Sequence, residues 1–551
     1  MKTRAQSVKA DMKSLAQTAF LAPFLAFAAC ESAVAPGSEA PAPSATALAP
    51  AAGWTAKTLP ELSAALDAGE VTAIELYEAF QARQGAVDGV LNAVLATNPD
   101  AEAQARASDA RRRDGVALGP LDGLPILIKD NIETRDRLAT TAGALALAGN
   151  VTGRDSPLVA GLRAQGVVIL GKANLSQWAN FRSERSLSGW SALGGQVRNP
   201  HMLDRNPCGS SSGSAVAAAA GLAAAAIGTE TNGSISCPAS VNGVVGFKPT
   251  VGLVSQTHII PISYSQDTAG PMTRTVRGAA MLLGPMAGAG EDYTLALDAG
   301  ALDGARIGVL RAEQGSNPDI IAVFDAALAQ LEAKGASLVE ITEFAPGVDN
   351  FWGKARRVLD TEFKAGLNEY LAGSPADLPV RTLEEVIAFN LGQAEVELAL
   401  FDQSIFDQAA TAAGLGDPEY LAALADVQRA AGAEGITALL AAHGVDALVA
   451  PSAPLAAPID AVNGDVWPAW AGGGYLAAIA GAPHLTVPMG EVRGLPVGLS
   501  FMAAPGSDAQ ILALGYAYEQ AADARIEPAY LATASDHPAT GQALAPYPLG
   551  R

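Results

Sequence analysis

Cysteine and histidine are scarce in this chain of 551 residues. Its three cysteines are too few for a disulfide scaffold, so the fold has to rest on a hydrophobic core. Its five histidines are scattered along the sequence without the short spacings that metal ligands show. The sequence therefore predicts no metal site, and we expect no cofactor.

Positive charge is also in short supply. The chain has 35 lysine and arginine residues against 56 aspartate and glutamate residues, which gives a formal net charge of −21. A surface of this sign repels a phosphate backbone, so nucleic acid is excluded as a partner. Charged residues make up only 17% of the chain and hydrophobic residues 49%, which excludes a mainly disordered protein. We expect a globular protein of enzyme size, and the sequence leaves its oligomeric state open.

The N-terminus is typical of a secretion signal. Basic residues precede an apolar run over residues 15–29, which is too short to span a membrane and ends in small residues. The run stops at Cys30 in a sequence that resembles a bacterial lipoprotein cleavage site. Two alternatives stay open: lipidation of Cys30, which would be the only link to a membrane, or ordinary cleavage nearby. Either alternative predicts an exported protein, periplasmic or anchored to a bacterial membrane.

Composition divides the chain into four regions. Residues 1–30 are the signal, residues 31–56 an Ala/Pro-rich disordered tether, residues 57–530 one large domain, and residues 531–551 a C-terminal tail. Within the domain, residues 345–440 are more acidic and helical than the rest. We interpret them as a variable insertion that shapes one side of a substrate cleft.

Short apolar runs alternate with helix-length segments through the large domain. This pattern predicts an α/β fold with a mixed, largely parallel central sheet covered by helices. The runs expected to be strands are residues 125–128, 167–170, 305–310, 337–341 and 447–449. Helical spacing of apolar residues predicts helices within residues 60–110 and over 320–334. Residues 214–226 are nearly all Ala, Val, Gly and Leu, so we expect a helix buried at the centre.

A lysine follows the first predicted strand. Lys129 comes directly after four apolar residues, so we expect its amine in a low-dielectric environment, where desolvation lowers a lysine pKa. A lysine that is neutral near pH 7 can act as a base. On this segment alone, the competing interpretation is a lysine paired with Asp130 at the strand end.

A Gly/Ser cluster over residues 208–214 continues into the predicted buried helix. Residues 209–213 match the nucleophile elbow of α/β hydrolases, with Ser211 in the nucleophile's position. That motif requires a strand directly before the turn, whereas residues 199–207 form a polar loop broken by prolines. We therefore reject the elbow, and a plain linker is also rejected because it would not lead into an apolar helix.

A third segment, residues 228–235, ends in a tight turn. Asn232 and Gly233 precede Ser234 there, and consecutive backbone N–H groups in such a turn can point one way and hold an oxyanion. Cys208 and Cys237 flank the two serine segments. Small buried residues near a turn are the favoured interpretation of these cysteines, and a bridge between them stays open.

Residues 124–131, 208–214 and 228–235, in this order, resemble the motifs of the amidase signature family. The resemblance covers most of the chain, and it implies one large α/β domain and cleavage of a carbon–nitrogen amide bond through an acyl-enzyme. Carried over by position, it implies that Lys129 is the base and Ser234 the acylated nucleophile. Ser210, on a cis peptide bond, would pass the proton between them.

The remaining site residues follow from the same motifs. The backbone N–H groups of Thr231, Asn232 and Gly233 are the expected oxyanion hole. Ser211 is expected to support the network through hydrogen bonds.

Departures from the common motifs resemble the peptide amidase branch of this family. Cys208, Ser212 and Asn232 stand where glycines are usual, and Ser236 stands where many members have arginine. The favoured prediction is therefore release of ammonia from C-terminal peptide amides. The alternatives are a broad aliphatic or aryl acylamidase and a protein like the amidase component of glutamyl-tRNA amidotransferase. The export signal disfavours the latter, and the presence of all three catalytic residues disfavours a protein that only binds.

Overall fold

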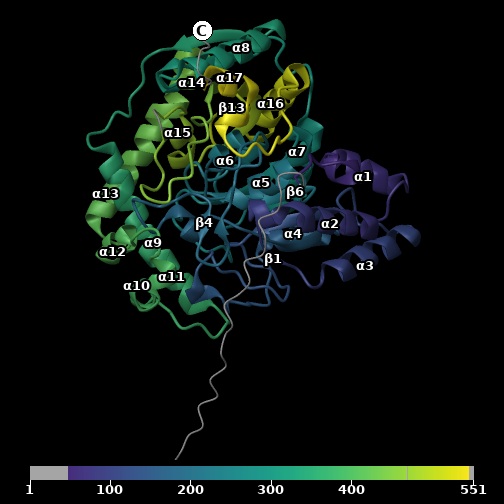
Figure 1. The fold of residues 1–551 in the computed structure, drawn as a ribbon. Helices are drawn as coiled ribbons and strands as arrows, with labels where there is room; N and C mark the ends of the chain where they lie inside the picture. The colour runs from purple at the N-terminus through teal and green to yellow at the C-terminus, as the bar shows by residue number, and fades with distance from the viewer. Residues whose placement is uncertain (1–47, 289, 468–469, 545–551) are drawn as a thin grey trace, which may run out of the picture. The chain divides into compact units, whose positions relative to one another are not determined.

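The computed structural model describes residues 48–288, 290–467 and 470–544, and Figure 1 shows their arrangement. Eleven strands form one mixed sheet. In spatial order they are β1 (Val94–Thr97), β3 (Val168–Ala173), β2 (Pro125–Lys129), β6 (Ala225–Glu230), β8 (Thr268–Thr273), β7 (Val245–Lys248), β12 (His484–Val492), β13 (Leu495–Met502), β11 (Ala447–Pro451), β9 (Arg306–Leu310) and β10 (Ser337–Ile341). The predicted α/β class is confirmed, and each of the five predicted strands is present.

Parallel pairing is confined to two blocks of this sheet. β3, β2 and β6 run parallel near one end, and β11, β9 and β10 run parallel at the other. Antiparallel pairs join the blocks through β8, β7, β12 and β13. In the first block, β2 and β6 are central strands whose residues are all buried, so their ends can carry groups shielded from water.

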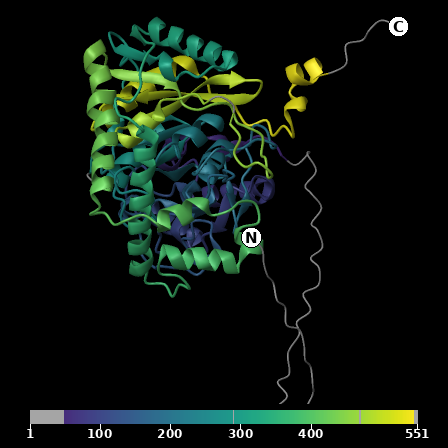
Figure 2. The same ribbon diagram turned by 90° about the vertical axis from the view of Figure 1, so that its left-hand side faces the viewer.

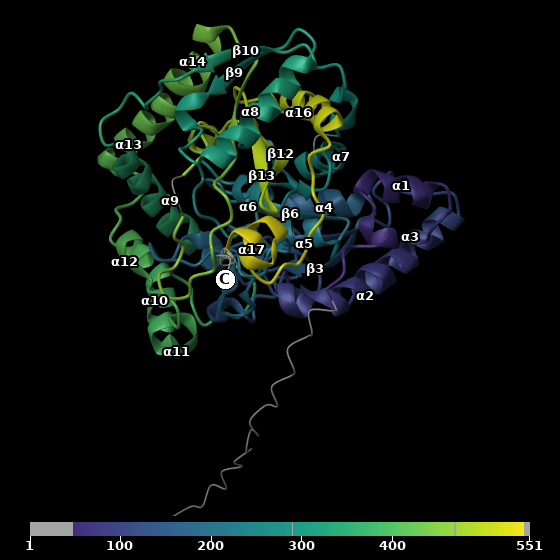
Figure 3. The same cartoon turned by 45° about the horizontal axis from the view of Figure 1, so that its top comes forward.

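Helices cover the sheet on both faces. Those that precede residue 345 or follow residue 430 are α1 (Leu59–Asp67), α2 (Ala73–Leu91), α3 (Ala101–Arg113), α4 (Pro157–Ala164), α5 (Ser212–Ala220), α6 (Ser236–Val241), α7 (Val276–Ala287), α8 (Pro318–Ala333), α14 (Thr437–His443), α15 (Gly474–Ile479), α16 (Asp508–Ala522) and α17 (Pro538–Leu544). Helices α8 and α16 lie side by side over β12 (Figure 3). The predicted helix over 320–334 is α8, and β1 interrupts the predicted helical region 60–110.

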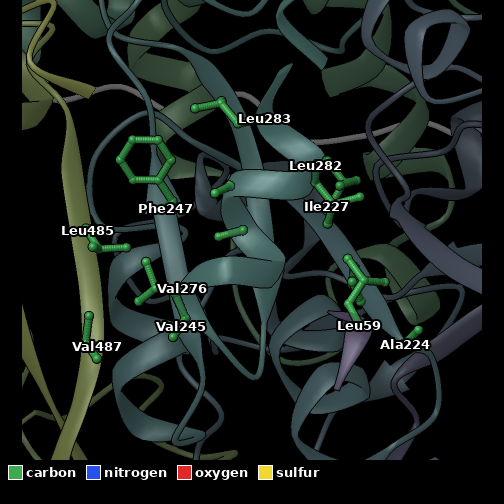
Figure 4. Packing of buried hydrophobic residues seen from close by; sticks show 14 of the residues in the cluster. Leu59, Ala224, Ile227, Val245, Phe247, Val276, Leu282, Leu283, Leu485 and Val487 are labelled. Carbon is green, nitrogen blue, oxygen red and sulfur yellow. The ribbon is translucent and has the colours of Figure 1, made fainter. Parts of the chain in front are cut away.

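Apolar side chains fill the space between sheet and helices. Figure 4 shows Phe247 of β7 close to Leu485 of β12 and to Leu283 of α7, all three fully buried. Complete burial of one such side chain stabilises the fold by about 1.5–3 kcal/mol. Burial in this core is the main contribution to the stability of the domain.

The predicted helix over 214–226 ends earlier than expected. Helix α5 stops at Ala220, and Ala225 and Ala226 belong to strand β6. Gly221 ends the helix in the left-handed region at φ 71°, where glycine is favoured, so the chain turns and enters the sheet. The rest of the prediction is confirmed, because all nine residues of α5 are buried.

All the regular secondary structure of residues 345–440 is helical. They form α9 (Phe351–Gly373), α10 (Leu383–Gly392), α11 (Ala394–Glu397), α12 (Ser404–Ala410) and α13 (Pro418–Gln428), followed by a π-helical turn, η7 (Arg429–Ile436). Helices α9 and α13 lie against each other along one side of the sheet (Figure 2). Apolar residues of α9, α10 and α12 pack into a second core with Trp178 and Phe181, which attaches this region to the rest of the domain.

No helix in the described part of the chain is long and apolar enough to cross a membrane. Within the same residues, no group of three His, Cys, Asp or Glu side chains is arranged to hold a metal ion. The predicted signal and Cys30 lie outside the described residues.

Candidate active site

Lys129 ends the central strand β2, and its side chain is completely buried. Its Nζ donates hydrogen bonds to Ser210 Oγ at 2.8 Å, to Thr229 Oγ1 at 2.8 Å and to Thr229 O at 3.3 Å. Burial lowers the pKa of Lys129 from 10.5 to about 7, against the opposing effect of the negative charges on Asp267 and Glu230. The amine is therefore neutral in a large fraction of molecules near neutral pH.

The competing interpretation of Lys129 is not what the structure shows. Asp130 accepts hydrogen bonds from the backbone N–H and the hydroxyl of Thr141. The nearest cation to Asp130 is Lys172, whose Nζ lies 4.0 Å from Oδ1. The carboxylate next to Lys129 in the sequence is thus engaged elsewhere, and Lys129 faces the serines.

Ser210 lies just before α5, on the cis peptide bond Gly209–Ser210. Its side chain is fully buried, and its carbonyl oxygen accepts a hydrogen bond from Ser176 N at 3.1 Å. With the amine of Lys129 at 2.8 Å, the Ser210 hydroxyl has a base within hydrogen-bonding distance and no access to bulk water.

Ser234 lies on the turn between β6 and α6, after Gly233, which adopts φ 84°. Thr231, Asn232, Gly233 and Ser234 line a cavity of ≈ 320 Å³ that also contacts Gly209. No acceptor among the described residues pairs with the backbone N–H groups of Thr231, Asn232 or Gly233. These three backbone donors belong to residues that line the same cavity as Ser234.

Ser211 connects the two serine segments. Its backbone N–H donates to the carbonyl of Ser234 at 3.1 Å, and its hydroxyl donates to Thr229 O at 3.0 Å. Thr229 N donates back to the same hydroxyl at 3.2 Å. Ser211 thus fixes the position of the Ser234 backbone relative to β6, in keeping with a supporting role.

Two residues that contact this network were missed by the sequence analysis. Thr229 Oγ1 accepts from Lys129 and from Asn131 Nδ2, at 2.8 and 3.0 Å. Glu230 is buried, and its Oε2 accepts from Ile235 N at 2.7 Å and Ser236 N at 2.9 Å, directly after Ser234. An acid at the end of a buried strand was the available signal for Glu230.

Asp267 is a third residue that contacts this network and was not assigned to the site from the sequence. It accepts from Thr231 Oγ1 at 2.6 Å and from the backbone N–H groups of Ile262 and Ser263 at 2.7 and 3.0 Å. Burial raises the pKa of Asp267 to about 6. It comes from the segment before β8, far from the three motifs in the sequence, and it anchors the start of the Ser234 turn.

Cys208 and Cys237 form a disulfide bond, so the favoured sequence interpretation of two separate buried cysteines is wrong. The bond joins the segment before Ser210 to helix α6 after Ser234, and both cysteines line the cavity. The sequence could not decide this pairing, because it depends on two turns approaching to a Cα–Cα distance of 6.0 Å. The bridge connects the segments that carry Ser210 and Ser234.

Comparison with known proteins gives a consistent result. The family model for amidases matches residues 75–512. A probable amidase of Arabidopsis thaliana is 36% identical over 502 residues, covering 86% of this chain and 92% of that protein. A putative amidase of Schizosaccharomyces pombe is 33% identical over 513 residues, covering 86% of each chain. The solved structure of native peptide amidase from Stenotrophomonas maltophilia matches with a TM-score of 0.81 and 46% identity, covering 86% of this chain and 98% of that one.

Proposed function

This chain belongs to the amidase signature family and is a hydrolase of amide C–N bonds, and from that premise we propose that it deamidates C-terminal peptide amides with release of ammonia. The observation that carries the proposal is the buried contact of 2.8 Å between Lys129 Nζ and Ser210 Oγ, next to the cavity that Ser234 lines. The similarity to a peptide amidase supports the choice of substrate class.

The first chemical step forms the acyl-enzyme bond. Neutral Lys129 accepts the hydroxyl proton of Ser210, and Ser210 accepts the proton of Ser234 as Ser234 Oγ attacks the amide carbon. The carbonyl oxygen becomes negatively charged in the tetrahedral intermediate. Backbone N–H groups of residues 231–233 stabilise this charge, and one such donor contributes about 10²- to 10³-fold in rate.

The second step breaks the carbon–nitrogen bond. Ser210 gives its proton to the leaving nitrogen and recovers one from protonated Lys129, so ammonia leaves and Ser234 stays acylated. Water then attacks the ester, and its proton passes along the same path. The products are the free carboxylic acid and the regenerated Ser234 hydroxyl, and every proton returns to its starting group.

The test is hydrolysis by the purified full-length protein of three substrate classes: peptide amides and simple aliphatic amides, measured by ammonia release, and N-aryl amides, measured by release of the aryl amine. Wild-type protein and the Ser234→Ala variant are compared on each. We expect fast turnover of peptide amides that the variant loses. Turnover restricted to aliphatic or aryl amides would favour the acylamidase alternative, and turnover that persists in Ser234→Ala would refute the mechanism.

We also propose that the enzyme works outside the cytoplasm, on the basis of the predicted signal and tether. Cell fractionation with an antibody to the chain tests the location. Replacing Cys30 by alanine separates the two alternatives, because a lipid on Cys30 predicts that the variant moves from the membrane fraction to the soluble fraction. Recovery of unprocessed chain in the cytoplasm would contradict export.

A further inference from the structure

A second cavity of ≈ 390 Å³ opens beside the one that Ser234 lines. The two cavities share Asn232, Gly233, Cys237 and Trp470 as wall residues. A substrate bound at Ser234 can therefore extend into the second cavity without leaving the protein surface. The catalytic network described above makes no use of this space.

Aromatic rings form one side of the second cavity. Trp352 at the start of α9 and Tyr475 at the start of α15 have ring centroids 5.0 Å apart at an interplanar angle of 56°. The buried ring of Phe351 packs against both, at 5.1 and 6.1 Å, and supports their positions. Trp352 is nevertheless 59% exposed, so its indole is accessible to a ligand in the cavity.

A carboxylate stands next to these rings. Glu313, in the short helix η6 (Arg311–Glu313), lines the cavity and is half-buried. Its Oε1 accepts the hydroxyl proton of Tyr475 at 2.9 Å, while its backbone oxygen accepts from Gly472 N at 2.7 Å. Among the described residues no lysine, arginine or histidine forms an ion pair with Glu313. One carboxylate oxygen is thus left for a ligand.

The charged residues that line the two cavities are both acidic. Of the described residues, Glu313 is the only acidic or basic one on the second cavity's wall, and Asp465 is the only one on the wall of the first. Asp465 is already engaged, since it accepts from Ser188 and from Asn206. Burial raises the pKa of Glu313, and a neighbouring cation opposes this shift because it favours the ionised carboxylate.

We propose that the second cavity is a subsite for a cationic group of the substrate, held between the carboxylate of Glu313 and the rings of Trp352 and Tyr475. A cation over an aromatic face is attracted by the ring quadrupole, and a neighbouring carboxylate adds a partly desolvated charge pair. The subsite deepens the proposed function and rests on it. It selects peptide amides that carry either a lysine or arginine side chain or a free N-terminal ammonium group.

The experiment compares matched dipeptide amides that differ in one charge. In the first pair the N-terminus is acetylated and one position carries either lysine or norleucine. In the second pair that position carries norleucine and the N-terminus is either free or acetylated. In the wild-type enzyme we expect kcat/KM to favour one cationic member by about tenfold, and the pair that shows it identifies the source of the cation. In Glu313→Gln the ratio should fall to near one, and in Trp352→Leu it should fall part of the way.

A matched control variant makes the same change in net charge at a position away from the cavity. Glu332→Gln, on the exposed side of α8, should retain the wild-type ratio. No preference in either pair for the wild type, or a preference that Glu313→Gln keeps, would overturn the subsite.

The subsite can also be tested without turnover. Calorimetric titration of the Ser234→Ala protein with N-acetyl-lysinamide, with norleucinamide and with N-acetyl-norleucinamide measures binding alone. Weaker binding of the uncharged N-acetyl-norleucinamide than of one of the two cationic amides by about tenfold, lost in the double variant with Glu313→Gln, supports the subsite even if no peptide amide is hydrolysed. Equal binding of all three amides would refute the subsite, while failure of the proposed function would appear only in the ammonia assay.

Discussion

The pH dependence of turnover reports directly on Lys129. Its pKa of about 7 leaves about half of the molecules with a neutral amine at pH 7, against roughly one in 3,000 for a lysine at its ordinary pKa of 10.5. The neutral amine is the base, so activity is gained as pH rises through the pKa. We expect kcat/KM to be about a tenth of its plateau at pH 6 and about nine tenths at pH 8.

The assay is ammonia release from an N-acetylated neutral peptide amide, which has no group that titrates between pH 5.5 and 8.5. Asp267→Asn removes a negative charge that raises the pKa of Lys129, so it should move the acid limb to lower pH. Lys129→Arg, whose guanidinium stays protonated, should lose at least about 10³-fold at every pH. The assignment of the base would be refuted if Lys129→Arg kept wild-type activity with the same acid limb. A wild-type kcat/KM that stays constant between pH 6 and 8 would refute it as well.

Three further predictions concern the same site. Ser210→Ala should lower kcat by about 10³-fold or more while the melting temperature stays near that of the wild type, and a variant that keeps most of its activity would remove Ser210 from the proton path. Replacing both Cys208 and Cys237 by alanine should lower the free energy of unfolding by roughly 3–4 kcal/mol for a separation of 29 positions, measured by urea titration; an unchanged midpoint would contradict this. Glu230→Gln should lower kcat about 10- to 100-fold with little change in KM, because it weakens the hydrogen bonds that fix Ile235 and Ser236; a change confined to KM would argue for a substrate contact instead.

Strands of this fold could be predicted from the sequence where both faces of the strand are buried, because such a strand is a short continuous run of apolar residues. Residues 125–128 and 447–449 are such runs, and both begin or fill strands of the sheet. Strand β6 was missed because Ala225 and Ala226 continue the small-residue composition of α5, and composition alone does not separate a buried helix from a buried strand. The boundary depends on the conformation at Gly221.

Local sequence motifs identified the segments that form the site. The other residues of the site were identified only by contacts between segments that are distant in the sequence. Lys129, Ser210 and Ser234 were identified through motif resemblance, and the structure brings their three segments into contact, with residues of the second and third segments lining one cavity. Glu313 and Trp352 lie far from these motifs in the sequence and reach the cleft only through the packing of α9 and η6. No periodicity or spacing indicates such long-range approach, so the individual residues of the pocket could not be predicted from one sequence.

The bond between Cys208 and Cys237 has a topological consequence for the site. It closes a covalent ring that contains Ser210, Ser211, Thr229, Glu230 and Ser234, together with helix α5 and strand β6. The ring stays closed when the chain unfolds without reduction, so these groups never separate beyond the span of one short loop. Lys129 is then the single member of the proposed catalytic set that has to be recruited from outside the ring each time the enzyme folds.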